Sequence, residues 1–474
     1  MLFNSPEFAI FFIITFGFYL LLPHKWQNRM LLVASYVFYS AWDWRFLSLI
    51  VISTILDYYC GIGISRAATR PGKRRFLIAS IVGNLSILAF FKYYNFFIAN
   101  GTELLQCLGF TVHYHTLLII LPLGISFYTF QTMSYTIDIY NGRIKPTTNF
   151  YDLALFVAFF PQLVAGPIEK ARDLLPQITA PRQVTLENIY RGCYLIFWGL
   201  FQKVFIADNL AKLVDPVFAS NGPYNGAMVL VALYAFAFQI LCDFGGYSNI
   251  ARGVGRCLGF EIMVNFNLPY FAANPREFWR RWHISLSSWL RDYLYIPLGG
   301  SRKGTWKTHR NIGITMLLGG LWHGASWTFI IWGGYHGMLL ILHRLLEPLK
   351  GKIVWFRKGM AKNLAHLAKI IIFFHLVCLG WLLFRSQSME QVGSMLKALV
   401  FDFRFTHEVA SFVYSMIFCI ALFLIVQVSQ YIKRDLMIVL KWPAVARTAL
   451  YLMCFYLLIL YGVTGGNEFI YFQF

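Results

Sequence analysis

The stretch Asn311–Leu342, NIGITMLLGGLWHGASWTFIIWGGYHGMLLIL, contains no Asp, Glu, Lys or Arg. A helix needs about 20 apolar residues to cross the hydrocarbon core of a bilayer, so this stretch is more than long enough for one crossing. It also contains His323, and an ionisable side chain at membrane depth is costly unless it faces a cavity or a partner. The stretch therefore predicts a membrane-embedded fold and a functional position within it.

The rest of the chain has the same character. Of its 474 residues, 58% are hydrophobic and 13% are charged, whereas soluble proteins carry about 25% charged residues. The composition is also too apolar for a disordered, collagen-like or disulfide-scaffold protein. Charge-poor segments recur along the whole length, and some are shorter or longer than one crossing. We expect an all-α, polytopic integral membrane protein with roughly 10 to 12 transmembrane helices, some broken or re-entrant, in a single domain over residues 1–474.

The basic loops predict the orientation of the chain. Residues 24–29 contain two Lys/Arg and residues 66–75 contain five. Because cytoplasmic loops carry the excess of Lys and Arg, we expect these loops in the cytoplasm and the N-terminus outside. The basic segments 252–310 and 344–369 should also face the cytoplasm, and the loop 92–115 should lie outside.

The net charge of +20 comes from 41 Lys+Arg against 21 Asp+Glu. These residues fall in short loops, where they meet anionic lipid headgroups, so we expect membrane lipids as partners and no nucleic acid. The cysteines have no C-x-x-C spacing and are expected to be small buried hydrophobes. His113 and His115 have ligand-like spacing without a third ligand nearby, so we expect no metal.

Two histidine regions are candidates for chemistry. His323 is flanked by Gly319, Gly320 and Gly324, which would let a ligand approach closely. Histidine suits proton transfer because its unperturbed pKa is about 6.5. The alternative is a core histidine that is hydrogen-bonded between helices, and spacing alone does not decide between the two.

The second region is residues 277–300, EFWRRWHISLSSWLRDYLYIPLGG, which contains His283. Its aromatic residues recur at helical spacing, which predicts an amphipathic helix at the membrane interface. Its arginines could meet lipid phosphates, or they could hold the phosphates of a nucleotide-bearing donor from the cytoplasm. The residues that we assign to donor binding are Arg280, Arg281, Arg291, Trp279 and Trp282.

Other ionisable residues are given structural roles. Lys203 and Asp208 lie five residues apart near the end of an apolar segment and predict an ion pair. His336 is expected to be a packed or tunnel-lining residue. Three aspartates near segment ends are expected to cap helices or face water: Asp57, Asp138 and Asp243.

The segment 277–300 and the later motif Leu-Gly-Gly-Leu-Trp-His323-Gly together resemble the signature of membrane-bound O-acyltransferases. Within that family the chain is most similar to the alginate O-acetyltransferase (AlgI-like) branch. Four further blocks carry the resemblance: LPLGISFY at 121–128, FPQLVAGP at 160–167, KVFIAD at 203–208 and DFGGYS at 243–248. The resemblance covers a signature core of about residues 121–345 and extends weakly into the helices of residues 370–474.

The resemblance implies an all-α core with a through-membrane tunnel and makes His323 the catalytic histidine. It places His283 at a second signature position, which holds Asn or His across the family. Gly245 and Asn249 depart from the branch, which has Ser and Asp there, so a catalytic role for position 249 lacks support.

The function implied by the resemblance is O-acyl transfer in the bacterial inner membrane, most simply of an acetyl group from cytoplasmic acetyl-CoA, with no permanently bound cofactor. His323 would take the proton of an acceptor hydroxyl, and His283 would orient the partner of His323 or polarise the carbonyl. Because the outer loop is short, we expect an extracytoplasmic acyl-accepting protein that serves a polysaccharide such as alginate. The alternatives are a proton-coupled transporter or flippase, a binding scaffold, D-alanyl transfer to teichoic acid, and peptidoglycan O-acetylation.

Overall fold

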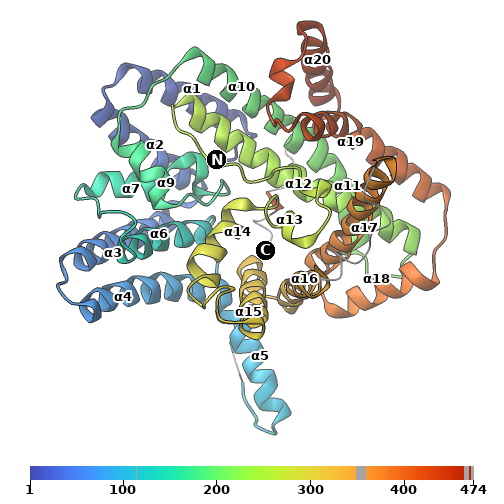
Figure 1. Ribbon diagram of the computed structural model, residues 1–474, viewed down its shortest axis with the longest axis horizontal. Helices are drawn as coiled ribbons and strands as arrows, with labels where there is room; N and C mark the ends of the chain where they lie inside the picture. The colour runs from blue at the N-terminus through green and yellow to red at the C-terminus, as the bar shows by residue number, and fades with distance from the viewer. Residues whose placement is uncertain (114, 348–358, 464–468, 471–474) are drawn as a thin grey trace. The chain divides into compact units, whose positions relative to one another are not determined.

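The computed structural model describes residues 1–113, 115–347, 359–463 and 469–470. These residues form helices and loops without a β-strand (Figure 1), which confirms the predicted all-α fold. Part of the basic segment 344–369, including Lys358, lies outside the described residues.

Within the described residues, seven stretches are long and apolar enough to cross a membrane. One of them, residues 24–66, has 43 residues, and as a continuous helix it would measure about 64 Å, roughly twice the hydrocarbon core. The number of such stretches is therefore not the number of crossings. The protein is a multi-pass membrane protein.

The chain forms two compact units that interleave in sequence, one of residues 1–196 and 250–263, the other of residues 197–249 and 264–474. The helices that begin in the first unit are α1 (Pro6–Leu21), α2 (His24–Asp43), α3 (Leu47–Arg66), α4 (Arg70–Leu88), α5 (Tyr94–Cys107), α6 (Ile125–Tyr140), α7 (Phe150–Ala158), α8 (Phe160–Leu163), α9 (Ala171–Thr179) and α10 (Leu186–Leu200). The helices that begin in the second unit are α11 (Asp208–Ala219), α12 (Gly226–Cys257), α13 (Pro275–Phe278), α14 (Ile284–Leu290), α15 (Thr305–His323), α16 (Trp327–Leu346), α17 (Gly359–Arg385), α18 (Met389–Phe401), α19 (His407–Lys433) and α20 (Ala444–Tyr461).

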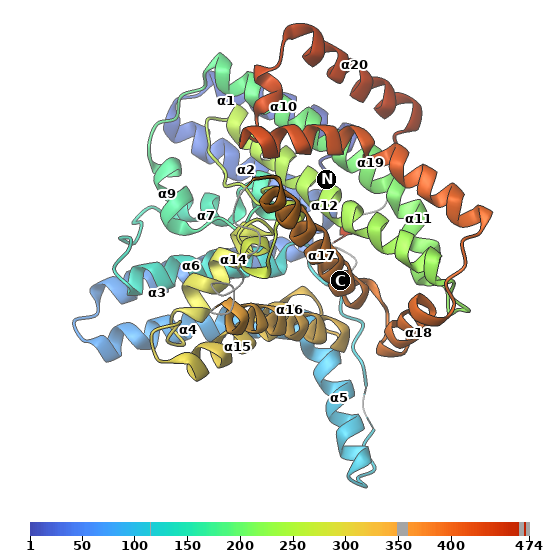
Figure 2. The same ribbon diagram turned by 45° about the vertical axis from the view of Figure 1, so that its right-hand side comes forward.

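In the first unit, α3, α4 and α6 pack together (Figure 2) around a buried polar cluster. Asp57 on α3 is fully buried. Its carboxylate accepts hydrogen bonds from Ser80 Oγ at 2.6 Å and from Asn84 Nδ2 at 3.0 and 3.1 Å, both on α4. The expectation that Asp57 caps a helix or faces water is wrong, because its hydrogen-bond donors come from a neighbouring helix 23 and 27 residues away.

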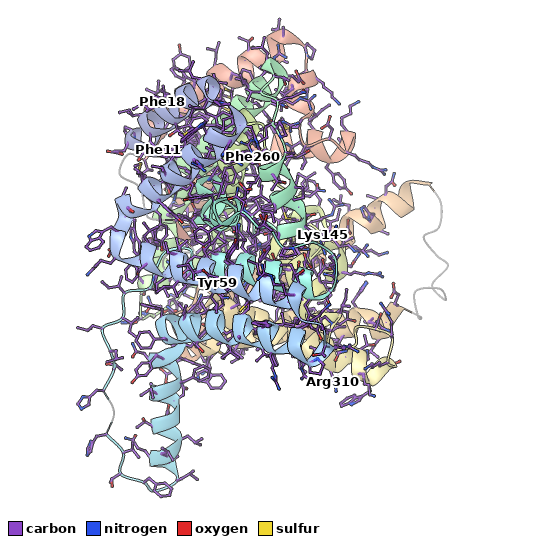
Figure 3. All side chains as sticks on the ribbon, turned by 90° about the vertical axis from the view of Figure 1, so that its left-hand side faces the viewer. Phe11, Phe18, Tyr59, Lys145, Phe260 and Arg310 are labelled. Carbon is purple, nitrogen blue, oxygen red and sulfur yellow. The ribbon has the colours of Figure 1, made fainter. Side chains whose placement is uncertain are left out.

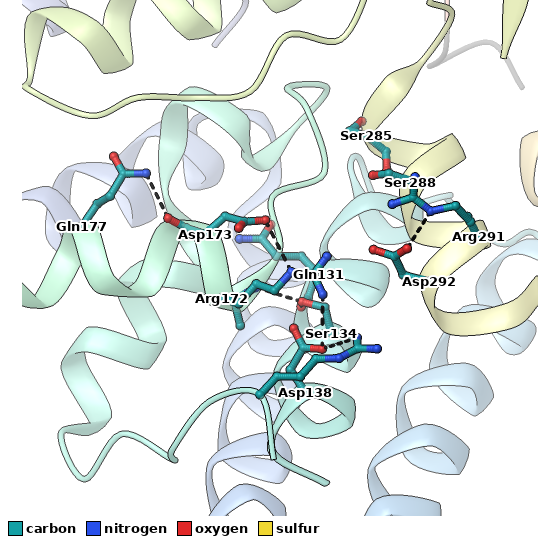
Figure 4. Close-up of polar contacts among 12 residues, drawn as sticks. Gln131, Ser134, Asp138, Arg172, Asp173, Gln177, Ser285, Ser288, Arg291 and Asp292 are labelled. Atoms are coloured by element: carbon teal, nitrogen blue, oxygen red, sulfur yellow. Dashed lines mark hydrogen bonds and ion pairs between the residues drawn. The ribbon is translucent and has the colours of Figure 1, made fainter. Parts of the chain in front are cut away.

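Asp138 on α6 is also fully buried. Its carboxylate accepts a hydrogen bond from Arg143 Nη1 at 2.9 Å and lies 4.0 Å from Arg172 (Figure 4). This aspartate therefore neither faces water nor caps a helix, and it ties the end of α6 to the loop that follows.

Large apolar side chains also cover the outside of the first unit. Phe18 on α1 is 58% exposed and Tyr59 on α3 is 67% exposed (Figure 3). A water-soluble protein rarely displays contiguous surface of this kind, whereas lipid-facing helices require it.

In the described residues, three short π-helical turns lie within longer helical segments, at Ala89–Tyr93, Phe201–Ala207 and Arg291–Tyr295. Such turns often occur at functional sites. The first of them joins α4 to α5, so the predicted outer loop 92–115 is largely helical.

In the second unit, the stretch Asn311–Leu342 forms the end of α15 and most of α16, which lie side by side (Figures 1 and 2). Glycines allow the two backbones to touch. A Cβ on Gly320 would lie 2.2 Å from the carbonyl oxygen of Phe329, and a Cβ on Gly333 would lie 2.2 Å from that of Met316. Because His323 is the last residue of α15, this contact also fixes the position of His323 against α16.

We expect Gly333→Ala to lower the thermal stability of the protein in detergent, because its methyl group would push α15 away from α16. Overpacking of this kind costs about 1–3 kcal/mol. Gly334→Ala is the matched control, since its Cβ would lie 3.4 Å from the Leu317 side chain, an ordinary contact. Equal unfolding temperatures for the two variants would contradict the close helix contact.

Candidate active site

The segment Glu277–Gly300 does not form the single amphipathic helix that its aromatic spacing predicts. It contains α13, α14 and the π-helical turn Arg291–Tyr295. The helical conformation is interrupted at His283, whose φ is 43° and ψ 54°. The break has a local cause. The Ile284 amide donates to the Asn265 carbonyl at 2.9 Å, and the Asn267 amide donates to the Arg281 carbonyl at 2.9 Å. The backbone here pairs with residues 265–267, so the aromatic side chains do not form one stripe.

The structure brings His283 and His323 together. Their ring centroids are 6.3 Å apart, and both side chains are buried, 0% and 4% exposed respectively. The His323 ring also contacts Trp322 and Trp332, each at 5.0 Å, edge to face. Burial lowers the pKa of His283 to about 3, so its imidazole is neutral at physiological pH.

His323 lines a cavity of about 560 Å³ in the second unit. Trp279 and Trp332 line its walls, together with Gly319 of α15. His283 is not among the lining residues. A buried histidine at the wall of a cavity of this size can meet a small-molecule ligand.

Basic residues gather at the opening of this cavity. Arg276, Arg280, Arg291 and Arg344 line it and are exposed, and Glu347 is the acidic residue among the lining side chains. Arg291 Nε donates to Asp292 Oδ1 at 2.7 Å (Figure 4). A smaller adjoining cavity of about 400 Å³ shares four lining residues with it: Arg276, Arg280, His343 and Glu347. The site thus combines a cationic opening with an aromatic interior.

The residues assigned to donor binding from the sequence are divided by the structure. Trp279, Arg280 and Arg291 line the cavity. Arg281 instead donates to Glu277 Oε1 at 2.8 Å, and Trp282 is 1% exposed within the core.

Sequence reasoning missed two of the arginines at the opening. Arg276 immediately precedes the quoted motif, and Arg344 lies 68 residues after Arg276, at the end of α16. Only the fold brings Arg344 beside α13, so no sequence spacing could have identified it.

His336 is fully buried and packs between Phe278, Trp279 and Trp332. Neither of its ring nitrogens has a hydrogen-bond partner among the described residues. It stands one helical turn behind Trp332, outside the residues that line the cavity, as a packed residue would.

Lys203 forms the expected ion pair with Asp208, at 2.9 Å, and a second one with Asp243, at 2.8 Å. Asp243 was expected to cap a helix or face water, but it is 3% exposed and also accepts a hydrogen bond from the Ile470 amide at 2.7 Å. Asn249 donates to Gln202 at 2.8 Å. Asp243 and Asn249 therefore connect α12 to neighbouring segments through polar contacts, and they do not line the cavity.

Metal ligands do not cluster in the described part of the chain. No group of three or more His, Cys, Asp or Glu side chains lies close enough there to hold an ion.

Comparison with known proteins places this site in a family. Residues 142–386, which include both histidines and every residue of the cavity, match the model of the MBOAT, membrane-bound O-acyltransferase family. The chain belongs to the membrane-bound O-acyltransferase family. It is therefore an acyltransferase, and the family decides against the transporter, flippase and scaffold alternatives.

The chain is similar to several curated members of this family. It is 44% identical over 401 residues to the probable alginate O-acetylase AlgI of Pseudomonas aeruginosa, covering 84% of this chain and 75% of the relative. It is 37% identical over 433 residues to a peptidoglycan O-acetyltransferase of Helicobacter pylori, covering 84% and 80%. A teichoic acid D-alanyltransferase of Bacillus subtilis is 31% identical over 275 residues, covering 55% and 68%.

Proposed function

We propose that this protein transfers an acetyl group from acetyl-CoA, bound from the cytoplasm, to a hydroxyl group on the outer side of the bacterial inner membrane. The observation that carries the proposal is a buried histidine, His323, at the wall of a cavity whose opening is lined by four arginines. The similarity to alginate O-acetylases favours acetyl as the acyl group and an extracytoplasmic polysaccharide as the final acceptor.

In the proposed reaction, the neutral imidazole of His323 takes the proton of the acceptor hydroxyl as its oxygen attacks the thioester carbonyl carbon. The carbon–sulfur bond breaks, and the proton passes to the departing thiolate, which leaves as CoA–SH. His323 ends α15, and the partial negative charge at a helix C-terminus stabilises the imidazolium that forms in between. General base catalysis of this kind typically contributes 10²–10⁴-fold to the rate.

The arginines at the opening suit the phosphate groups of the donor. A guanidinium binds phosphate oxygens through two parallel hydrogen bonds, and Arg276, Arg280, Arg291 and Arg344 together present four such groups. The thioester arm would then extend past Trp279 toward His323. This arrangement places charge recognition at the membrane surface and the reaction in the dry interior.

The acceptor side favours a second protein. The segment predicted to lie outside, residues 92–115, is short, and α5 occupies most of it. A polymeric glycan needs an extended polar surface to place one hydroxyl within hydrogen-bond reach of a base. We therefore propose that the acetyl group passes first to a hydroxyl of an extracytoplasmic partner protein, which acetylates the glycan.

His323→Ala and His323→Gln should abolish acetyl transfer while expression and membrane insertion stay near normal. The loss should be at least about 100-fold, because a general base contributes that much or more. The measurement is thiol release from acetyl-CoA in membranes that contain the protein. His309→Gln, on the same helix and outside the cavity lining, is the control. Retention of more than about a tenth of the activity by His323→Ala would exclude it as the base.

Arg280→Gln should raise KM for acetyl-CoA about tenfold with a smaller change in kcat, because loss of one charge-assisted hydrogen bond costs about 1.5–3 kcal/mol at most. Arg281→Gln is the matched control, since the neighbouring Arg281 lines neither cavity and pairs with Glu277. If KM rises only in Arg281→Gln, the donor binds elsewhere.

Purified protein supplied with acetyl-CoA should release thiol slowly, and a soluble polysaccharide added alone should not become acetylated. The reason is that the segment predicted to lie outside, residues 92–115, is too short to hold a polymer near the base. Acetyl content of the polysaccharide, measured by mass spectrometry, checks this expectation. Efficient acetylation without a second protein would refute the proposed partner.

A further inference from the structure

His283 is held by a compact set of buried hydrogen bonds. Asn265 is 1% exposed, and its Oδ1 lies 3.3 Å from His283 Nδ1. The same oxygen accepts hydrogen bonds from Ser285 Oγ at 2.9 Å and from the Ser285 backbone amide at 3.3 Å. On its other side, Asn265 Nδ2 donates to Ser248 Oγ of α12 at 3.3 Å.

The orientation of the Asn265 amide follows from the Ser285 backbone. A backbone N–H can only donate, so the Asn265 atom that faces it must be the acceptor oxygen and not the amide nitrogen. His283 Nδ1 faces this same oxygen and must therefore carry a hydrogen. Ser285 Oγ donates its hydrogen to Asn265 Oδ1 and lies 3.3 Å from His283 Nδ1. It can therefore also accept a hydrogen bond from Nδ1.

A neutral imidazole carries one hydrogen, so a hydrogen on Nδ1 leaves Nε2 as an acceptor. We propose that Asn265 is a positioning residue that holds His283 in the Nδ1–H tautomer, so that His283 Nε2 accepts a hydrogen bond during acyl transfer. This inference depends on the proposed function. It excludes one of the two roles expected for His283, polarising the carbonyl, because an acceptor nitrogen has no hydrogen to donate to a thioester oxygen.

The backbone supports the same arrangement. His283 has a left-handed conformation, which costs free energy in a residue with a Cβ and is retained where the surrounding structure imposes it. The hydrogen bond from the Ile284 amide to the Asn265 carbonyl, 2.9 Å, imposes it here. Asn265 thus holds both the backbone beside His283 and its ring.

Asn265→Asp tests the inference through the pH dependence of kcat/KM for acetyl-CoA, measured as thiol release in membranes between about pH 4 and 9. A carboxylate beside Nδ1 favours the imidazolium and should raise the pKa of His283 from about 3 by about one to three units, into the range of the measurement. Activity requires the neutral ring, so the acid limb of the profile should move to higher pH. Among the described residues that contact His283, His323 is the one whose side chain is titratable. The other contacting residues do not titrate in this pH range: Phe244, Phe266, Trp322, Asn265 and Ser285.

Asn267→Asp is the matched control, because it adds the same charge two residues away on an exposed side chain, and its profile should match that of the unaltered protein. Asn265→Ala keeps the backbone hydrogen bond but removes the acceptor, and kcat should fall about 10- to 100-fold with KM nearly unchanged, as when a reacting group is misplaced. An unshifted profile in Asn265→Asp together with an undiminished kcat in Asn265→Ala would overturn the inference.

The tautomer can also be observed without activity. In ¹⁵N-histidine-labelled protein in bilayers, the signals that disappear in His283→Asn should be those of a neutral ring with its hydrogen on Nδ1. A hydrogen on Nε2 would refute the proposal even if acyl transfer is confirmed. Absence of thioester turnover in the unaltered protein, with the Nδ1–H signals present, would instead refute the proposed function.

Discussion

The absence of water in the bilayer interior is the constraint on which this structure depends. A polar group placed there must find its hydrogen-bond partner within the protein, or it remains unsatisfied at a cost of several kcal/mol. The buried carboxylate of Asp57 meets a hydroxyl and an amide from a neighbouring helix, and Lys203 bridges two aspartates. His323 differs from these groups because it borders a cavity, where a substrate can contact it.

The same constraint separates the two ends of the site. The arginines that line the cavity are exposed to solvent at its opening, and tryptophans line it near His323. Electrostatic interactions grow stronger as the surroundings become drier. Recognition of a charged donor is therefore possible at the surface, and small charge shifts at the reacting atoms carry more weight inside.

The sequence predicted those features that depend on composition or on neighbours in the chain. Hydropathy was sufficient for the all-α membrane fold, and the spacing of Lys203 and Asp208 was sufficient for their ion pair. The amphipathic helix over Glu277–Gly300 was wrong because periodicity does not register pairing with another segment, here residues 265–267. Arg344 reaches the cavity opening only through the packing of α16 on α13. The nearness of His283 and His323 was implied by family resemblance, since 40 residues separate them in the chain.

The left-handed backbone at His283 has a consequence for mutational scanning. In a saturation library at this position, each substitution changes both the side-chain chemistry and the backbone preference. Valine and isoleucine tolerate a positive φ poorly, whereas asparagine and glycine accept it. The loss of activity in β-branched variants would thus result mainly from a distorted backbone. Only the asparagine and glycine variants would measure what the imidazole itself contributes to activity.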